Sequence, residues 1–223
     1  GGRSSFVYEK EINKTKLQLV GGAELQYGFF NTQVAKNKNG RPDSVRTNDD
    51  VKYATSSFFG QANIELKNGW VFTTGLSLNK SKVNFTRLSS YPVLEQSRTY
   101  QNELSPRLAV QKKIEKNAAV FASVSKGFSP PTISELLPST GMISTALEAE
   151  QGINYEVGGR VGLLNNRLRL EATAFYFKLN DALVSRRDSS NADFFVNAGD
   201  TRQQGIELTA DYSKNFEKSI FKT

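Results

Sequence analysis

The chain has 223 residues, 29 Lys and Arg against 22 Asp and Glu, and neither His nor Cys. Without His it cannot form a Ser-His-Asp hydrolase site or an imidazole metal site, and without Cys it cannot form a disulfide, a zinc–thiolate site or a thiol nucleophile. The longest apolar run, Ala118–Ala122, is far shorter than the about 20 residues of a membrane-spanning helix. We expect no enzyme activity, no cofactor and no metal site.

Apolar residues recur at every second position in one stretch after another. Between Thr15 and Phe30 the odd positions read Leu17, Leu19, Gly21, Ala23, Leu25, Tyr27 and Phe29. The same alternation recurs over residues 58–66, 72–79, 103–111, 154–163, 168–177 and 205–212. A period of two is typical of β-strands that have one apolar and one polar face. The pattern predicts an all-β chain of about ten strands.

The connections between these strands alternate between short and long. Short turn-like pieces lie at 12–15, 67–69, 115–117, 165–166 and 213–217, and long polar stretches lie at 31–53, 85–101, 127–153 and 183–200. This alternation predicts an antiparallel up-and-down meander with short turns at one end and long loops at the other, which is typical of transmembrane β-barrels. Within one long stretch, Thr132 and Glu135 have the spacing of a capping box and predict a short helical turn.

Strand length and aromatic placement point the same way. About 10 residues, tilted near 40°, rise by roughly 25 Å, the height of the apolar band of such a barrel. Aromatic residues near the strand ends are candidates for an interfacial girdle on the lipid-facing surface. Toward the long loops these are Phe29, Phe30, Tyr53, Phe85, Phe128 and Tyr155, and toward the short turns Trp70 and Tyr212.

Several short motifs lie between residues 102 and 212. Residues 125–136 read SKGFSPPTISEL, and there follow LEAE at 147–150, NYEVG at 154–158, AFY at 174–176, NAG at 197–199 and GIEL at 205–208. In this order the motifs resemble the TonB-dependent outer-membrane receptors, whose passage corresponding to residues 125–136 reads SKGF-x-x-P-x-x-x-E-L. The resemblance implies a barrel of about 22 strands closed by an N-terminal plug. Neither a plug nor a TonB box is recognisable, so we expect residues 1–223 to be a partial β-barrel domain that lacks the plug and is not transport-competent alone.

The resemblance also implies a function, a location and partners for the intact protein. It would be an active-transport receptor in the outer membrane of a Gram-negative bacterium, taking up a scarce ligand such as a ferric siderophore with energy supplied through TonB. Its partners would be outer-membrane lipid and lipopolysaccharide, its own plug, the TonB complex and the ferric siderophore. We expect no nucleic-acid partner, because the aromatic residues are not interleaved with the basic ones on one strand face.

Charged residues on the polar face of the strands are expected to line the lumen of a closed barrel and to contact the plug. Their signs alternate across neighbouring strands, which would allow pairing. The candidates are Glu103, Arg107, Glu156, Arg160, Arg169, Glu171 and Glu207. Of these, Glu156 and Glu207 match positions of the family. The alternative is that they form the solvent face of a soluble sheet.

A second set of residues in the long stretches is a candidate for ligand capture. The resemblance to siderophore receptors implies Arg and aromatic side chains at the outer vestibule, because ferric chelates are often anionic and aryl-bearing. The candidates are Arg98, Tyr100, Arg186, Arg187, Phe194 and Phe195, with the adjacent arginines as the preferred pair. Alternatively these residues are simply solvated, or the arginines contact lipopolysaccharide phosphates, which the net charge of +7 also favours.

Two other classes of protein remain open at this point. A passive porin or adhesion-type outer-membrane barrel would share the strand pattern, and a soluble β-sandwich that binds ligands through its loops would share the alternation. A barrel protease is disfavoured, because the usual acid–base machinery of such an enzyme includes His.

Overall fold

The computed structural model describes residues 1–138, 142–189, 191–216 and 219–222. Nearly all of the regular structure in these residues is β-strand, which confirms the predicted fold class. The strands are β1 (Gly2–Ile12), β2 (Thr15–Lys38), β3 (Arg41–Glu65), β4 (Trp70–Arg87), β5 (Leu94–Thr99), β6 (Glu103–Glu115), β7 (Ala118–Ser129), β8 (Glu150–Leu163), β9 (Leu168–Asn180), β10 (Leu183–Arg187), β11 (Asp193–Asn197), β12 (Thr201–Phe216) and β13 (Ser219–Lys222), and a short helix, α1 (Ile133–Leu136), lies between β7 and β8. No helix in these ranges is long and apolar enough to cross a membrane.

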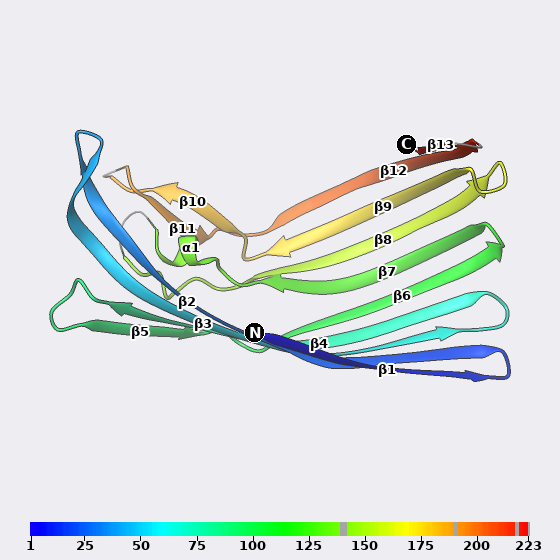
Figure 1. Ribbon diagram of the computed structural model, residues 1–223, viewed down its shortest axis with the longest axis horizontal. Coiled ribbons are helices and arrows are strands. Elements are labelled where there is room, and N and C mark those ends of the chain that lie inside the picture. Colours follow the sequence, from blue (N-terminus) through cyan, green and yellow to red (C-terminus); the bar gives the residue numbers. More distant parts are fainter. Residues whose placement is uncertain (139–141, 190, 217–218, 223) are drawn as a thin grey trace.

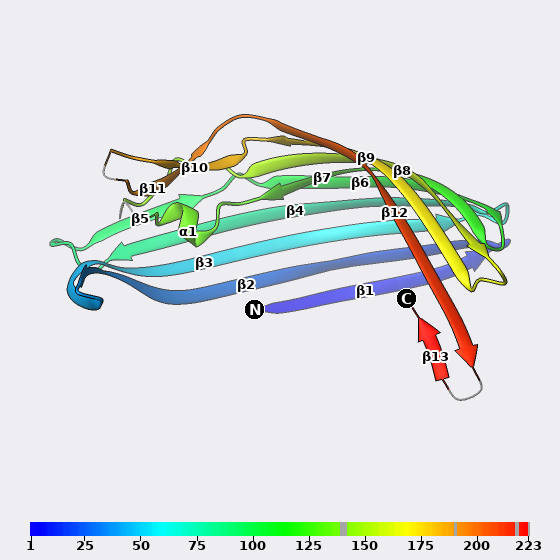
Figure 2. The ribbon, with the colours of Figure 1, turned by 90° about the horizontal axis from the view of Figure 1, so that it is seen from above.

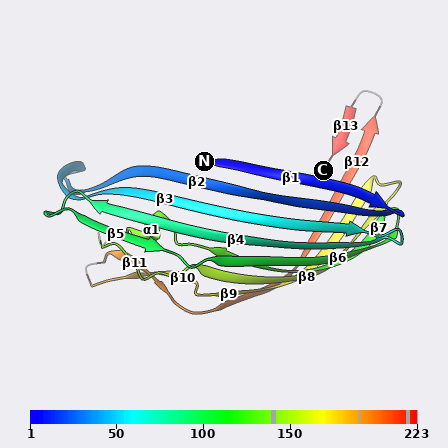
Figure 3. The ribbon, with the colours of Figure 1, turned by 90° about the horizontal axis from the view of Figure 1, so that it is seen from below.

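The main strands form one antiparallel sheet in the order in which they follow along the chain. This order is β1-β2-β3-β4-β6-β7-β8-β9-β12-β13, with β5 paired to β4 beside it. The sheet curves into a single-layered open trough, in which β1 and β13 lie at opposite edges (Figures 1–3). Strands β10 and β11 form a separate hairpin beside α1, at the end of the trough where the long connections lie (Figure 1). The up-and-down meander of about ten strands is therefore confirmed.

Short turns join the strands at the other end of the trough. The turn between β1 and β2 consists of Asn13 and Lys14, both of which have a positive φ. Two adjacent residues with positive φ fit the twist of a tight hairpin. The predicted turns at 12–15, 67–69, 115–117 and 165–166 agree with the strand bounds. At 213–217, by contrast, β12 continues to Phe216, and residue 217 lies outside the described residues.

The long stretches are more ordered than the sequence predicts. Residues 31–53 were expected to form a loop, and this prediction is wrong, because β2 and β3 continue through them to a turn at Asn39 and Gly40. Likewise β5 pairs with the end of β4, and β10 pairs with β11. Residues 139–141 and 190, which belong to two of the predicted loops, lie outside the described residues. At the base of the β2–β3 hairpin Thr47, Asp49 and Val51 are buried, whereas residues 33–46 are exposed and are held by strand pairing.

The two faces of the sheet differ in polarity along the middle of the strands. Directly paired residues form an apolar row across eight strands, consisting of Leu17, Ile64, Phe72, Val110, Ala122, Val157, Ala174 and Ile206. We call the face that carries this row the outer face and the opposite one the inner face. On the outer face Val157 is 59% and Ile206 74% exposed. In the described part of the chain the sheet is a single layer (Figures 2 and 3), unlike a β-sandwich, in which such a row is buried against a second sheet.

The aromatic residues near the strand ends are divided between the two faces. Phe29, Tyr155 and Trp70 are exposed, as expected of an outer girdle. The assignment of Phe30, Tyr53 and Phe85 to that girdle is wrong, because they lie in or against a buried cluster on the inner face. Successive residues of a strand point to opposite faces, so Phe29 and Phe30 cannot share one surface.

This buried cluster fills the trough at the end where the long hairpins lie. We call it the mouth cluster, and its members are Val51, Val83, Phe85, Tyr100, Leu136 and Leu147. Leu136 comes from α1 and is fully buried, so the connection between β7 and β8 folds back onto the inner face of the sheet. Burial of apolar side chains, worth about 25 cal/mol per Å² of area removed from water, holds this connection in place.

Candidate functional site

The mouth cluster is capped by α1, whose N-terminus has the predicted capping box. The backbone N–H of Thr132 donates to Oε2 of Glu135 at 2.6 Å. The reciprocal contact, from the N3 backbone to the Thr132 side chain, is also present. Two backbone donors that the helix cannot satisfy internally are thereby satisfied. The helix holds Leu136 over the inner face of β3 and β4, where Val51, Val83 and Phe85 lie.

Arg98 and Tyr100, two of the predicted ligand residues, lie beside this cluster. The guanidinium of Arg98 stands 5.4 Å from the centre of the Tyr100 ring and forms an ion pair with Glu148. Tyr100 is 4% exposed, and its hydroxyl has no hydrogen-bond partner in the structure. Burial raises the pKa of Tyr100 to about 12. The structure thus brings Arg98 and Tyr100 together, but it places them beneath the segment 142–149.

Residue 148 ties that segment to both sides of the trough. The Glu148 carboxylate binds Arg98 on β5, while its backbone N–H donates to Oδ1 of Asn197 on β11 at 2.9 Å. The Asn197 amide nitrogen in turn donates to the carbonyls of Glu148 at 3.1 Å and Asp181 at 2.7 Å. The segment 142–149 is therefore a strap between β5 and the β10–β11 hairpin.

Arg186, Arg187, Phe194 and Phe195 lie on the β10–β11 hairpin. In its register Arg186 is opposite Phe194, and Arg187 is opposite Asp193, with which it forms an ion pair at 2.9 Å. Adjacent strand residues point to opposite faces, so the two guanidinium groups diverge and cannot act as one clamp. Phe195 packs against the mouth cluster, and Arg186 with Phe194 occupies the other side of the hairpin. A role in ligand capture stays a prediction for these residues.

Sequence reasoning missed a buried ion pair in the mouth. Arg87 donates from Nε to Asp49 Oδ1 at 2.7 Å and from a terminal nitrogen to Oδ2 at 3.1 Å, while the Asp49 side chain is only 3% exposed. The pair joins β3 to the end of β4 at directly opposed positions. The sequence would have indicated this pair only if β3 and β4 had been predicted to continue as paired strands beyond their apolar segments.

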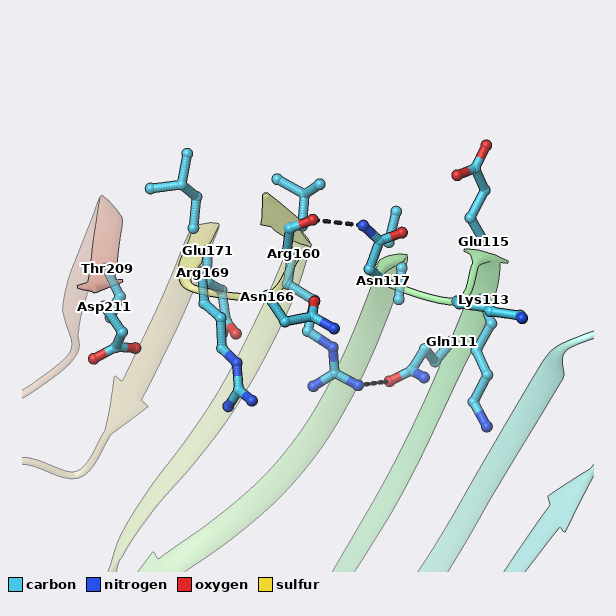
Figure 4. Close-up of a pocket in the computed structure, with 16 residues that line it drawn as sticks. Gln111, Lys113, Glu115, Asn117, Arg160, Asn166, Arg169, Glu171, Thr209 and Asp211 are labelled. Carbon is cyan, nitrogen blue, oxygen red and sulfur yellow. Dashed lines mark hydrogen bonds between the residues drawn. The ribbon is translucent and has the colours of Figure 1, made fainter. Parts of the chain in front are cut away.

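The seven charged residues predicted to face a lumen do share the inner face. The register places Arg160 opposite Glu171 and Glu156 opposite Ser123, and the others lie an even number of residues from these positions or their partners. Figure 4 shows the charged side chains of Arg160 and Arg169 projecting from one side of the sheet, near its turn end. They border a hollow of about 560 Å³ that also includes Lys113 and Asp211.

Hydrogen bonds to amides, more than ion pairs, connect this inner face. Arg160 donates to Oε1 of Gln111 at 2.8 Å (Figure 4). Glu156 accepts from Asn154 at 2.7 Å and from Ser123 at 3.2 Å. Of the seven predicted residues, only Glu103 has an ion pair in the described part of the chain, with Lys126 at 4.0 Å. The face is therefore a polar wall with unpaired charges of both signs.

The acidic side chains of the described residues are the candidates for a metal site. Among the described residues no group of three or more acidic side chains is placed to hold a metal ion. The mouth instead offers guanidinium groups next to aromatic rings, and the wall offers charges of both signs. Such surfaces bind anionic or aromatic ligands and polar protein segments without reacting with them.

Three comparisons with known proteins agree with this geometry. The metal-pseudopaline receptor CntO of Pseudomonas aeruginosa PAO1 is 30% identical over 151 residues, which are 66% of this chain and 20% of that protein. The ferric-catecholate import receptor Fiu of E. coli K12 gives a TM-score of 0.72 at 11% identity, covering 96% of this chain and 35% of that chain. The unliganded ferric citrate transporter FecA gives 0.71 at 16% identity, covering 94% and 31%. These structural likenesses concern the fold alone.

The chain thus spans about a fifth of the length of its curated relative and about a third of the solved chains. A family model described as TonB dependent receptor-like, beta-barrel, matches residues 3–222. The match covers all the strands of the curved sheet, whose outer face is apolar and whose inner face is polar. The chain therefore belongs to the family of TonB-dependent receptors and forms part of their β-barrel.

Proposed function

We propose that this chain is part of the wall of an outer-membrane receptor that takes up a metal chelate, most simply a ferric siderophore, with energy supplied through TonB. The observation that carries the proposal is the division of the single-layered sheet into an apolar outer face and a polar inner face. A single-layered sheet with these faces suits lipid on one side and water on the other. Residues 1–223 would then be a partial barrel domain, and the remaining strands and the plug would belong to other parts of the receptor.

The ligand class rests on the relatives and on the mouth. The relatives are described as a metal-pseudopaline receptor and as ferric-catecholate and ferric citrate transporters. In this chain Arg186 and Phe194 are paired on the side of the β10–β11 hairpin that faces away from the mouth cluster. A guanidinium group next to a ring can bind an anionic, aryl-bearing chelate by hydrogen bonds and stacking.

The polar wall supports a second part of the proposal, the seat of a plug. Unpaired charges of both signs line the hollow near the turn end, including Arg160, Arg169 and Glu171. Exposed ion pairs contribute only about 0–1 kcal/mol each, so these residues would orient a plug more than bind it tightly.

Uptake by the complete receptor tests the proposal. The full-length receptor, produced in cells that lack their own siderophore receptors, is given radiolabelled ferric chelates with and without TonB. We expect TonB-dependent uptake of one chelate class, and Arg186→Ser is expected to weaken its binding about tenfold. Arg167→Ser, an exposed arginine in the turn between β8 and β9, serves as the matched control and should change binding less than twofold. Uptake that is independent of TonB would instead favour a passive porin, and no uptake of any metal chelate would exclude the proposal.

A further inference from the structure

Three lysines lie together on the outer face, just beyond the apolar band. We call Lys52, Lys80 and Lys82 the lysine patch. All three are exposed, and none has an ion pair in the described part of the chain. Like charges held close together create a positive potential, so an anion bound among the three would be attracted by all of them.

The strand register fixes how close these lysines are. Lys80 and Lys82 are two residues apart on β4, and so lie about 7 Å apart on the same face. Lys52 is paired with Asn84, which makes it a diagonal neighbour of Lys82 on the adjoining strand. Diagonal neighbours lie about 7–8 Å apart at the backbone, within reach of long side chains. The three ammonium groups can therefore converge on one anionic group.

The surroundings of the patch point to a lipid. Toward the turn end, the same face of β4 carries only uncharged residues, from Trp70 to Leu78. Beside the patch, Tyr27 is 63% and Phe29 55% exposed, and they stand in the rows of Lys82 and Lys52 respectively. From the turn end, the outer face therefore carries an apolar band first and then aromatic rings at the same level as the lysines.

Acidic side chains occupy only the next row, farther from the band. Asp50 and Glu95 are both paired with Thr86, beyond Lys52 and Lys82 along the strands. Asp50 already accepts a hydrogen bond from Asn31 at 2.9 Å. Neither acid lies between the lysines and the apolar band. The positive potential of the patch is therefore directed toward the level at which the headgroup of a lipid on this band would lie.

We propose that the lysine patch binds the phosphate of a membrane lipid whose acyl chains lie along the apolar band below it. The inference rests on the proposed membrane placement and adds a defined lipid site to it. Lysine is well suited to this contact, because its ammonium group is a flexible point charge with three donors. The aromatic rings of Tyr27 and Phe29 cover the glycerol or sugar part of the headgroup, the depth at which aromatic side chains concentrate in membranes.

Lipid binding by the complete receptor tests the site. The full-length receptor is placed in discs of zwitterionic lipid that contain a small fraction of bisphosphorylated lipid A, and bound lipid A is counted by native mass spectrometry. The triple variant Lys52→Gln, Lys80→Gln, Lys82→Gln is compared with the charge-matched control Lys36→Gln, Lys38→Gln, Lys116→Gln, whose lysines lie at the tip of the β2–β3 hairpin and in a turn. We expect the first to bind lipid A at least tenfold more weakly and the control to change less than twofold.

Two further arms define the chemistry. A triple Lys→Arg variant of the patch is expected to keep binding within threefold, and dephosphorylated lipid A is expected to bind wild type as weakly as lipid A binds the Gln triple. Equal loss in the two Gln triples, or equal binding of dephosphorylated lipid A, would overturn the proposal. Failure of the wild type to enter discs at all would overturn the membrane placement itself, whereas entry without phosphate-dependent binding would overturn the lipid site alone.

Discussion

The buried ion pair between Asp49 and Arg87 gives a sharp test of how the long β2–β3 hairpin is held. Asp49→Asn keeps the shape of the side chain but leaves the guanidinium of Arg87 without its counter-charge, where it is only 15% exposed. Breaking a buried pair by removing one partner costs about 3–5 kcal/mol. Because Arg87 retains some contact with water, we expect the lower end, about 3 kcal/mol, which corresponds to about a 100-fold change in a local opening equilibrium.

Hydrogen–deuterium exchange of the complete receptor measures this opening directly. We expect amides of the outer part of β3 and of the end of β4 to exchange about 100-fold faster in Asp49→Asn, and those near the turns to be unchanged. Asp50→Asn is the control, because its side chain lies on the other face and binds only an amide. Adding Arg87→Gln to Asp49→Asn should restore part of the protection by removing the unpaired charge. Exchange within threefold of wild type in Asp49→Asn would refute the assigned role of the pair.

Three further outcomes follow from the contacts of the mouth and wall. Tyr100→Phe should leave stability at pH 8 within about 0.5 kcal/mol, because the hydroxyl has no partner. Since the pKa of Tyr100 is raised above the usual 10.0 to about 12, wild type should lose stability as the pH rises from 10 to 12 in an alkaline unfolding series, and the variant should lose less. Gly158→Ala should lower the folded yield on electrophoresis, because a Cβ there would lie 2.6 Å from both the Phe121 ring and a backbone oxygen, whereas Gly159→Ala, with its nearest neighbour at 3.6 Å, should not. Glu148→Gln should speed amide exchange of residues 142–149 about tenfold, and unchanged exchange would show that the ion pair with Arg98 does not hold the strap.

The fold could be predicted from the sequence wherever the two faces of a strand differ in polarity. There apolar residues recur at every second position, as between Leu17 and Tyr27, and the strand order followed from the short turns. The failure came at 31–53, where polar residues on both faces suggested a loop. Only residues 47–53 have an inner side that packs against the mouth cluster, whereas residues 33–46 are exposed and are held by pairing between β2 and β3. A single sequence does not reveal a partner that folds back from residues 133–147.

For the candidate site, strand parity alone places charged residues such as Arg160 and Glu171 on one face, and the structure has them there. Their role in lining a lumen stays a prediction. The burial of Tyr100 under the strap could not be foreseen, because it depends on the position of the strap, which Glu148 holds through contacts with Arg98 and Asn197 that are distant in sequence. By contrast, the opposite orientation of Arg186 and Arg187 could have been predicted, because it follows once residues 183–187 are recognised as a strand.

In the proposed membrane placement, the lipid boundary would leave a signature in the sequence, because the phase of alternation reverses at that level. On β4 the even positions are uncharged up to Leu78 and charged at Lys80 and Lys82, while the odd positions become apolar at Val83. On β3 the same reversal falls between Phe58, which is exposed on the outer face, and Tyr53, which packs inward. A strand that leaves the proposed membrane would pass from lipid to water on its outer face and from water to the mouth cluster on its inner face, so both faces would change polarity at the same level. Reading such a reversal as a continued strand, and not as its end, would have extended β3 and β4 beyond their apolar segments.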